Sequence, residues 1–258
     1  MNTIEVNALR RDFNGHRAVD GITFTVEAGE IFGFLGPNGA GKTTTMRLLT
    51  GFLPPTDGTA VIAGHDIFSD PLAARRAIGY LPESPPVYPE MSVESYLTYV
   101  AKLKDVPRGK RRAAVDRALE RCGLTQVRRR VIGALSKGFR QRVGLAQAIV
   151  HDPPVMILDE PTVGLDPIQI REIRGLIAEL AGAREGKART VILSTHILTE
   201  VEAICQRVII MHRGRKALDA PLADLQKGGA SLEEIFARTT AREATADLAA
   251  GIDVEAES

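Results

Sequence analysis

Cysteine is scarce in this sequence. The chain of 258 residues contains two cysteines, Cys122 and Cys205, which lie far apart. Their spacing excludes a C-x-x-C motif, and we expect both to be small buried side chains in a reducing compartment.

A strong net charge is missing as well. The formal net charge is +1, and apolar residues make up 44% and charged residues 25% of the chain, as in ordinary globular proteins. Such a balance gives no global attraction to nucleic acid or anionic lipid. Two basic runs, 108–112 and 128–130, are interleaved with few aromatic residues. This favours solvated helix faces over a nucleic-acid or lipid contact, and we expect no nucleic-acid partner.

Long apolar runs are also absent. No stretch approaches the roughly 18 apolar residues that would span a bilayer, and residues 1–6 lack the basic and apolar regions of a signal peptide. We therefore expect a cytosolic chain without direct membrane insertion.

The sequence does contain a glycine-rich loop. Residues 36–43 match G-x-x-x-x-G-K-[ST], a loop that wraps backbone amides around nucleotide phosphates. The apolar run 30–35 predicts a buried strand before it, and a predicted helix follows with its positive end toward the phosphates. The predicted nucleotide-binding residues are Gly36, Pro37, Asn38, Gly39, Ala40, Gly41, Lys42, Thr43 and Thr44.

Two side chains of this loop have separate predicted roles. Lys42 supplies a mobile positive charge for the β and γ phosphates. The Thr43 hydroxyl is a hard oxygen ligand suited to Mg²⁺.

Polar residues follow two further apolar strands. Asp159 and Glu160 come after the run 155–158, and His196 follows 190–194. Ligands gather at the carboxyl ends of parallel strands, so both acids should face the loop rather than merely end a strand. Asp159 would hold Mg²⁺ through its water shell, and Glu160 would orient the attacking water as general base. His196 would hydrogen-bond the γ-phosphate or the water.

The organisation of the chain changes along its length. Alternating apolar residues such as Ile4, Val6 and Ala8 predict strands over 3–35, and four prolines make 82–89 a linker. Helical periodicity over 91–150 predicts an inserted helical subdomain, and strand–helix alternation after residue 155 predicts a mostly parallel sheet. Helix caps are expected at Ser136, Asp166 and Ser231. A last short helix starts at Ser231, and we expect a loosely ordered tail from about residue 241.

Together these segments resemble the nucleotide-binding subunit of ATP-binding-cassette (ABC) transporters over roughly residues 1–240. Residues 36–43 match the Walker A loop and 155–160 match Walker B. Residues 135–141 resemble the signature segment, 164–166 the dimer loop, and His196 the switch histidine. Phe13 stands where the family carries an aromatic ring that stacks on adenine.

The resemblance implies an α/β fold with a P-loop NTPase (RecA-like) core, an N-terminal antiparallel β subdomain and an inserted α-helical subdomain. It implies one ATPase domain over 1–240. The expected division is 1–83 and 151–220 for the nucleotide-binding core, 84–150 for the helical signature subdomain, 221–240 for a C-terminal helix and 241–258 for the tail.

The chain departs from the common family pattern at three places. Lys137 and Phe139 alter the signature, Glu83 replaces the usual Gln after a strand, and Phe13 replaces Tyr. Lys137 and Glu83 resemble the ABC-2 exporter branch, which includes gliding-motility, drug-resistance and copper-maturation cassettes. Glu83 would remain able to bind Mg²⁺ directly. Lys137 would add a cation to the nucleotide site if its side chain turned inward.

The resemblance also implies a mechanism and partners. Two cassettes, a second copy or a paralogue, sandwich two ATP molecules with Mg²⁺. Ser136, Lys137 and Gly138 then meet the partner's ATP, and Asp166 lies in the dimer loop. Hydrolysis by Glu160 and His196 drives separate integral membrane permease subunits, so the cassette would be peripheral, on the cytoplasmic face of the cell membrane.

Two alternatives remain open from the sequence. One is a soluble cassette protein that remodels ribosomes or DNA; the single cassette and the lack of a long coiled coil weigh against it. The other is a nucleotide-gated module without turnover, against which the presence of Glu160 and His196 weighs.

Overall fold

Two β-sheets of different kinds pack on each other in the computed structural model, which describes residues 2–182, 188–227 and 229–249. An antiparallel sheet has the strand order β2-β1-β4-β5, and a larger, mostly parallel sheet has the order β10-β9-β3-β8-β7-β6. The strands of the first sheet are β1 (Asn2–Phe13), β2 (His16–Glu27), β4 (Asp57–Ile62) and β5 (His65–Asp66). Those of the second are β3 (Ile31–Leu35), β6 (Ile78–Leu81), β7 (Val155–Asp159), β8 (Thr190–Thr195), β9 (Arg207–His212) and β10 (Arg215–Pro221).

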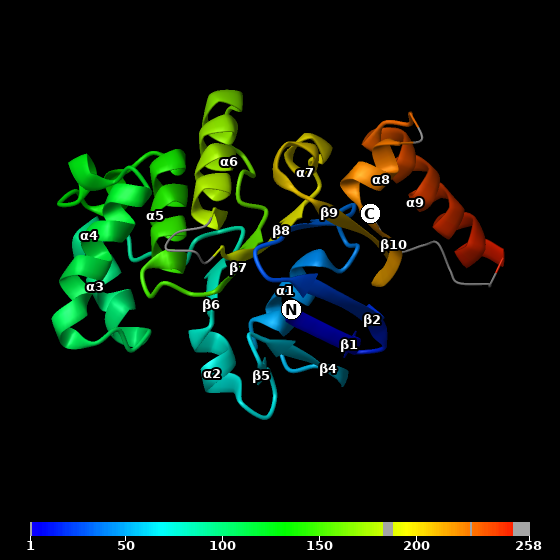
Figure 1. The fold of residues 1–258 in the computed structure, drawn as a ribbon, viewed down its shortest axis with the longest axis horizontal. Helices are drawn as coiled ribbons and strands as arrows, with labels where there is room; N and C mark the ends of the chain where they lie inside the picture. The colour runs from blue at the N-terminus through cyan, green and yellow to red at the C-terminus, as the bar shows by residue number, and fades with distance from the viewer. Residues whose placement is uncertain (1, 183–187, 228, 250–258) are drawn as a thin grey trace.

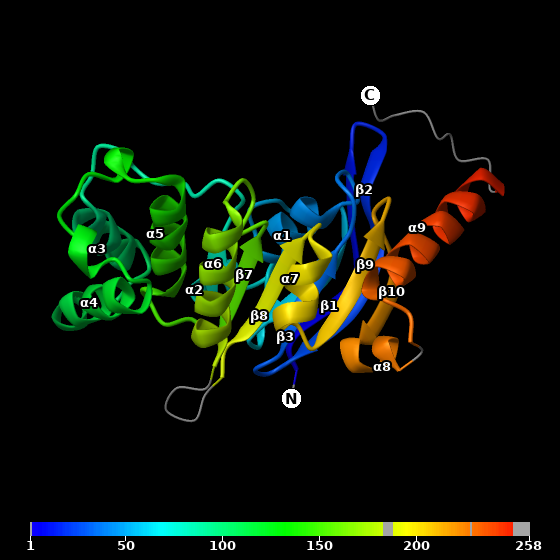
Figure 2. The ribbon, with the colours of Figure 1, turned by 90° about the horizontal axis from the view of Figure 1, so that it is seen from above.

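Helices cover both faces and both ends of the larger sheet (Figures 1 and 2). They are α1 (Lys42–Leu49), α2 (Pro71–Arg76), α3 (Val93–Leu103), α4 (Arg111–Arg121), α5 (Lys137–Ile149), α6 (Pro167–Ala181), α7 (Leu198–Ile204), α8 (Leu222–Gln226) and α9 (Leu232–Ala249). Short 3₁₀ turns occupy Arg108–Lys110, Thr125–Val127 and Ile132–Ala134. Helices α3, α4 and α5 lie at one end, α8 and α9 at the other, and α6 and α7 above the strands. The predicted α/β class with a P-loop NTPase core is confirmed.

The parallel strands of the larger sheet place their carboxyl ends together. Strand β8 lies between β3 and β7, with Leu35 opposite Thr195 and Asp159 opposite Ser194. Every residue of β3 and β7 is buried, as expected for continuous apolar runs in a sheet covered on both faces. This register brings the segments that follow β3, β7 and β8 to one edge.

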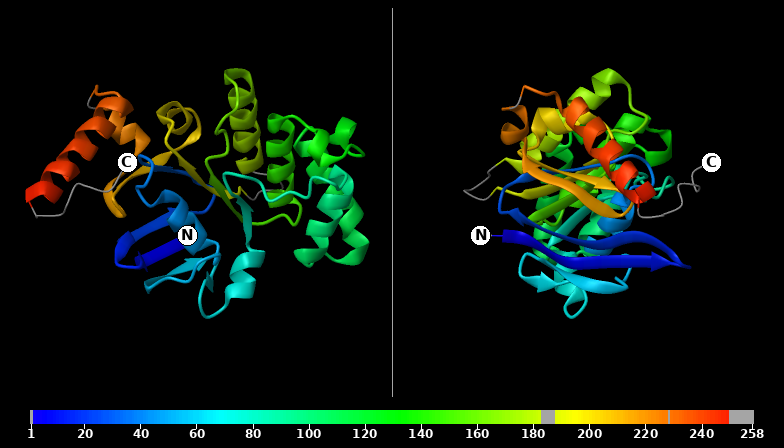
Figure 3. Two further views of the ribbon diagram at one scale, coloured as in Figure 1. Left: turned by 180° about the vertical axis from the view of Figure 1, so that it is seen from behind. Right: turned by 90° about the vertical axis from the view of Figure 1, so that its right-hand side faces the viewer.

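An apolar core joins the two sheets, which lie one above the other when the molecule is viewed from its end (Figure 3). Phe24 of β2 stacks on Phe32 of β3, with ring centroids 5.6 Å apart. Such aromatic pairs stabilise a core beyond the area they bury. The antiparallel sheet is thereby held against the strand that leads into the glycine-rich loop.

Strand β1 contains an irregularity that the sequence pattern did not predict. Alternation placed Ala8 on the buried face with Ile4 and Val6, but Ala8 is exposed and has a φ of 45°. The register shifts between Val6 and Leu9. Leu9 is buried instead, because the bulge moves the inward position on by one residue.

The last helix is longer than expected. Helix α9 extends to Ala249, so the tail predicted from residue 241 is helical as far as the structure describes it. Alanine, glutamate and arginine favour helix, which accounts for the extension. Residues 250–258 of that tail lie outside the described residues.

Helix α5 packs directly on β6. A side chain at Gly79 would meet the backbone of Ala148, and a side chain at Gly144 would lie 2.6 Å from Leu81. The helix and the strand are thus in close contact along their length.

Both cysteines are buried and unpaired, as expected. Within the described ranges, no helix combines the length and apolar character that a bilayer crossing requires.

Candidate nucleotide site

The glycine-rich loop is tightly enclosed by backbone. A side chain at Gly36 would lie 2.7 Å from the carbonyl oxygen of Met211, and one at Gly41 would overlap the carbonyl oxygen of Ala18. Gly41 also has a φ of 96°, a left-handed conformation that L side chains rarely adopt. Packing and backbone conformation therefore both require glycine at position 41.

The turn between β9 and β10 is hydrogen-bonded to this loop. The N–H of Gly214 donates to the carbonyl of Ala40 (3.0 Å), and the N–H of Asp20 donates to the carbonyl of Gly214 (2.9 Å). The sequence analysis did not identify Gly214, because no local pattern links a turn near the end of the chain to residue 40. The available signal was a glycine two residues after the apolar strand 207–212.

The ammonium group of Lys42 lies inside the loop. Its Nζ donates to the carbonyl oxygens of Gly36 (2.8 Å) and Pro37 (3.1 Å) and lies 3.5 Å from Oε1 of Glu160. Lys42 is 5% exposed, whereas residues 37–39 are exposed. The loop thus combines an enclosed positive charge with an accessible backbone, the arrangement that holds phosphate groups.

Thr43 and Asp159 meet beside this charge. Oγ1 of Thr43 lies 3.3 Å from Oδ1 of Asp159, and Asp159 is fully buried. Its Oδ2 and the Oγ of Ser194 are buried without hydrogen-bond partners among the described residues. Burial raises the pKa of the Asp159 carboxyl. Unsatisfied hard oxygen atoms fit a hydrated Mg²⁺ ion, which prefers carboxylate, hydroxyl and water ligands.

Glu160 contacts both Lys42 of the loop and His196 after β8. Its Oε2 lies 2.9 Å from Nδ1 of His196, whereas its Oε1 makes the ion pair with Lys42. The N–H of Glu160 donates to the carbonyl of Ser194 (2.9 Å), and its φ is 48°. A carboxylate fixed between a cation and an imidazole is positioned to accept a proton.

Comparisons with known proteins show the family to which the chain belongs. The family model described as ABC transporter matches residues 19–163. This chain belongs to the ABC transporter family. It is an ATP-binding subunit of that family and an ATPase, as predicted.

Curated relatives show the likeness over most of both chains. The bacitracin transport ATP-binding protein BcrA of Bacillus licheniformis is 39% identical over 88% of this chain and 72% of its own. The Nod factor export ATP-binding protein I of Paraburkholderia xenovorans is 36% identical over 90% and 76%. Among solved structures, cbiO1 from Clostridium perfringens, described as part of the ABC transporter complex cbiONQ, has a TM-score of 0.78. It is 29% identical and covers 93% of this chain and 95% of its own.

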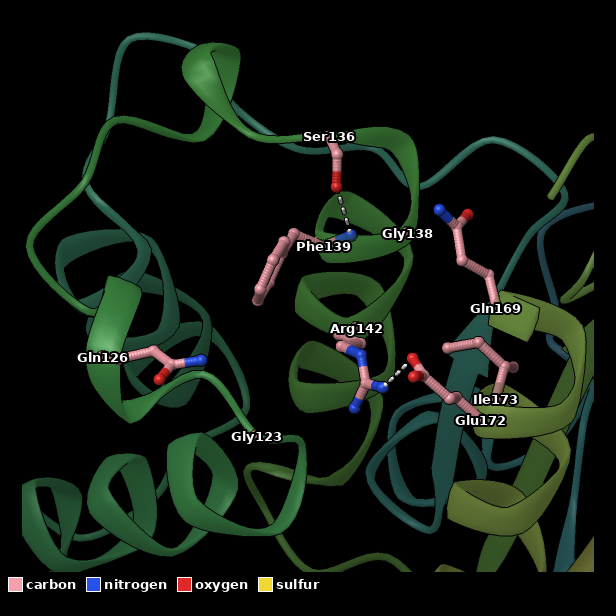
Figure 4. Close-up of a pocket in the computed structure, with 9 residues that line it drawn as sticks. All are labelled: Gly123, Gln126, Ser136, Gly138, Phe139, Arg142, Gln169, Glu172 and Ile173. Atoms are coloured by element: carbon pink, nitrogen blue, oxygen red, sulfur yellow. Dashed lines mark hydrogen bonds and ion pairs between the residues drawn. The ribbon is translucent and has the colours of Figure 1, made fainter. Parts of the chain in front are cut away.

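The ABC signature segment lies apart from the Walker residues, at the start of α5. Ser136 caps the helix, its Oγ accepting from the N–H of Phe139 (3.4 Å). Gly138 faces the side chain of Gln169 on α6. Figure 4 shows the pocket between these two helices, closed lower down by an ion pair of Arg142 with Glu172 (2.8 Å). We find no hydrogen bond or ion pair between described Walker and signature residues.

Two departures from the family pattern, Lys137 and Glu83, and the dimer-loop residue Asp166 have different surroundings. The ammonium of Lys137 lies against Gly164 of the same chain rather than over its own Walker A loop. Asp166 caps α6, accepting from the N–H groups of Ile168 and Gln169 (both 2.9 Å). Glu83 is exposed in the irregular segment after β6, and its side chain makes no hydrogen bond or ion pair with a described residue.

Phe13 stands at the tip of the β1–β2 hairpin. It pairs with His16 and is 36% exposed, with the guanidinium carbon of Arg11 4.5 Å from the ring centroid. Ala18 of the same hairpin contacts Gly41 of the Walker A loop. One ring face is covered by Arg11, so a base would stack on the other.

Replacing Phe13 with Ala is expected to weaken ATP binding with little change in kcat. Stacking of a base on a ring contributes ~1–3 kcal/mol, equally in ground and transition states, so KM for ATP should rise about 5- to 150-fold. Steady-state kinetics over an ATP series measures both constants. Phe68→Ala, which removes a ring that is 74% exposed, is the control. An unchanged KM for Phe13→Ala would show that the ring packs within the hairpin and does not stack on the base.

Proposed function

We propose that this chain is the ATP-hydrolysing motor of a membrane exporter, in which two cassettes close around two ATP molecules and drive separate permease subunits. The observation that supports it most is the contact of Glu160 with both Lys42 and His196. In this proposal Glu160 is the general base, and its two contacts link the phosphate loop to His196.

The proposed chemistry divides among these side chains. Lys42 and the exposed backbone of 37–39 bind the phosphates, and Phe13 stacks on the base. Glu160 accepts a proton from the attacking water while His196 holds its carboxylate in orientation. Thr43, Asp159 and Glu83 are the residues that we propose to hold Mg²⁺. When bound, the ion neutralises charge on the β and γ phosphates.

The second cassette would complete each site. The signature residues Ser136, Lys137 and Gly138 form no polar contact with the described Walker residues of their own chain, although the start of α5 offers free N–H groups to an anion. A second copy or a paralogue, turned head to tail, would bring this helix end to the γ-phosphate. Asp166, which begins the neighbouring helix, would lie at the same interface.

Exposed apolar side chains mark a surface suited to the permease. A groove is lined by Phe52, Arg75, Ile78, Tyr80 and Lys104 among others. Phe52 is 71% exposed, and Leu103, next to Lys104, is 63% exposed. Exposed apolar patches commonly bind other proteins. A membrane subunit docked here would hold the chain at the cytoplasmic face of the membrane. The name of the Nod factor export relative supports an exporter.

Replacing Phe52, which lines the groove, with Asp tests this docking surface. A charge at the groove should prevent co-purification with the permease and abolish permease-dependent changes in ATPase rate. The basal rate should stay within about twofold of the parent, because exposed substitutions perturb folding little. The control is Val131→Asp, at an apolar residue 46% exposed outside the groove. Equal loss of binding in both variants would contradict a specific role of the groove.

A further inference from the structure

Glu200 is a buried carboxylate to which the mechanism above assigns no part. It lies in α7, four residues after His196, and is 1% exposed. Burial raises the pKa of its carboxyl, with hydrogen bonds from Thr162 and Thr195 acting in the opposite direction. Burying an ionisable group is costly unless its oxygen atoms are satisfied.

Both oxygen atoms of Glu200 accept hydrogen bonds, and from different segments. Oε1 accepts from the hydroxyl of Thr162, and Oε2 accepts from the hydroxyl of Thr195 at 2.7 Å. Thr162 and Thr195 are themselves buried. One carboxylate therefore connects the segment that follows β7 with the end of β8.

These two segments carry the proposed catalytic pair. Thr162 follows Glu160 by two residues, and Thr195 immediately precedes His196. Thr195 also accepts from the N–H of Ile197 (3.1 Å), so its hydroxyl fixes the backbone on both sides of His196. Any change in the separation of Thr162 and Thr195 would be transmitted to the 2.9 Å contact between Glu160 and His196.

The backbone at Glu160 increases the need for such a connection. A φ of 48° is uncommon for a non-glycine residue. Such conformations persist where surrounding contacts over-determine them. Besides the connection through Thr162, the N–H of Glu160 donates to Ser194 on β8. Two contacts thus hold the Glu160 segment against the strand that carries His196.

The surroundings of Glu200 favour positioning over packing alone. Arg174 of α6 donates to the carbonyl of Thr199 (3.1 Å), which places a cation near the N-terminal turn of α7. An apolar side chain would fill the same space without the cost of burying a charge. The carboxylate of Glu200, by contrast, fills the space and also orients the two threonine hydroxyl groups that donate to it.

We propose that Glu200 is a positioning residue for ATP hydrolysis, which sets the geometry of Glu160 and His196 through Thr162 and Thr195. This inference rests on the catalytic roles proposed for Glu160 and His196. Glu200 itself touches neither nucleotide nor water in this scheme.

The test compares Glu200→Ala and Thr195→Val with Thr195→Ser, which keeps the hydroxyl. A misplacement near 1 Å can cost about 100-fold in rate, so we expect kcat of the first two to fall roughly 10- to 100-fold. KM for ATP should stay within about twofold, because the orientation of Glu160 and His196 acts on the transition state and not on the binding of ATP. Thr195→Ser should keep most of kcat. The control Glu202→Ala removes an exposed carboxylate from the same helix.

A double variant strengthens the assignment. If Glu200 and Thr195 act as one unit, Glu200→Ala combined with Thr195→Val should lower kcat no further than the stronger single change. Multiplicative effects would overturn the inference, as would a parental kcat in Thr195→Val. Thermal denaturation without nucleotide checks that each variant folds, and the Thr195 pair decides the question if Glu200→Ala does not fold.

The outcomes also separate this inference from the proposed function. An ATPase rate of Glu160→Gln equal to that of the parent would contradict the catalytic roles proposed for Glu160 and His196. If Glu160→Gln is inactive but Glu200→Ala is folded and fully active, the positioning role of Glu200 is contradicted and the proposed function stands.

Discussion

Replacing Glu160 with Gln is expected to abolish steady-state ATP hydrolysis while leaving ATP binding intact. The amide has nearly the same shape but cannot accept a proton, and loss of a general base costs roughly 10²–10⁴-fold in rate. Lys42 would keep its hydrogen bonds to Gly36 and Pro37, so the phosphate loop should remain in place. Phosphate release at saturating ATP measures the rate, and equilibrium binding of a fluorescent ATP analogue measures the affinity.

The same variant tests the pairing of cassettes. With hydrolysis blocked, ATP should hold two copies together, so light scattering should show a dimer with ATP and Mg²⁺ and a monomer without nucleotide. Glu202→Gln is the control for loss of an exposed carboxylate. Undiminished phosphate release by Glu160→Gln would place the base elsewhere, and a monomer with bound ATP would contradict the two-cassette arrangement.

The second large effect is expected at the other end of the site, where Gly41→Ala should lose ATP binding. The new methyl group would overlap the carbonyl of Ala18, and the residue would have to keep a φ of 96° or leave it. Either shift moves the N–H groups of the loop. Losing two charge-assisted hydrogen bonds at roughly 1.5 kcal/mol each would weaken ATP binding about 100-fold.

Gly64 provides a matched control for the backbone strain. Its φ is 85°, but no atom lies within 4 Å of the position that a Cβ would take. Gly64→Ala should lower the free energy of unfolding by roughly 1–2 kcal/mol, the cost of the left-handed conformation, with unchanged ATP affinity. Gly41→Ala should lower it further. Chemical denaturation and equilibrium ATP binding compare the two, and equal effects on both measurements would show that packing against Ala18 is unimportant.

The local parts of the site could be predicted from the sequence because each depends on neighbouring residues. The strand before residue 36 and the helix after residue 43 fix the position of the glycine-rich loop between them. The apolar run before Asp159 indicates that this carboxylate lies at the carboxyl end of a strand. The order of strands could not be predicted in this way. That β8 lies between β3 and β7 is a property of the sheet, and it decides that His196 meets Glu160.

Other features were hidden because a distant residue decides them. The bulge at Ala8 accompanies the close approach of Gly58, where a side chain would meet the Ala8 carbonyl. The hydrogen bond from Gly214 depends on a turn after β9, and Glu200 becomes interpretable only when Thr162 and Thr195 are placed on either side of it. Pattern along the chain predicts which elements form; the contacts between elements set the details of the site.

The close contact of α5 with β6 has a consequence for how the chain can be divided and recombined. Strands β6 and β7 are adjacent and parallel, so the chain between them must cross over, and α5 is the helix that packs on the sheet as such a crossover does. In terms of connectivity, α5 completes the βαβ unit of β6 and β7, and α3 and α4 are inserted between β6 and α5. A chimera that exchanges only α3 and α4 with a relative should fold more readily than one that exchanges α3, α4 and α5 together, because only the second replaces the partners of Gly79 and Leu81 on α5.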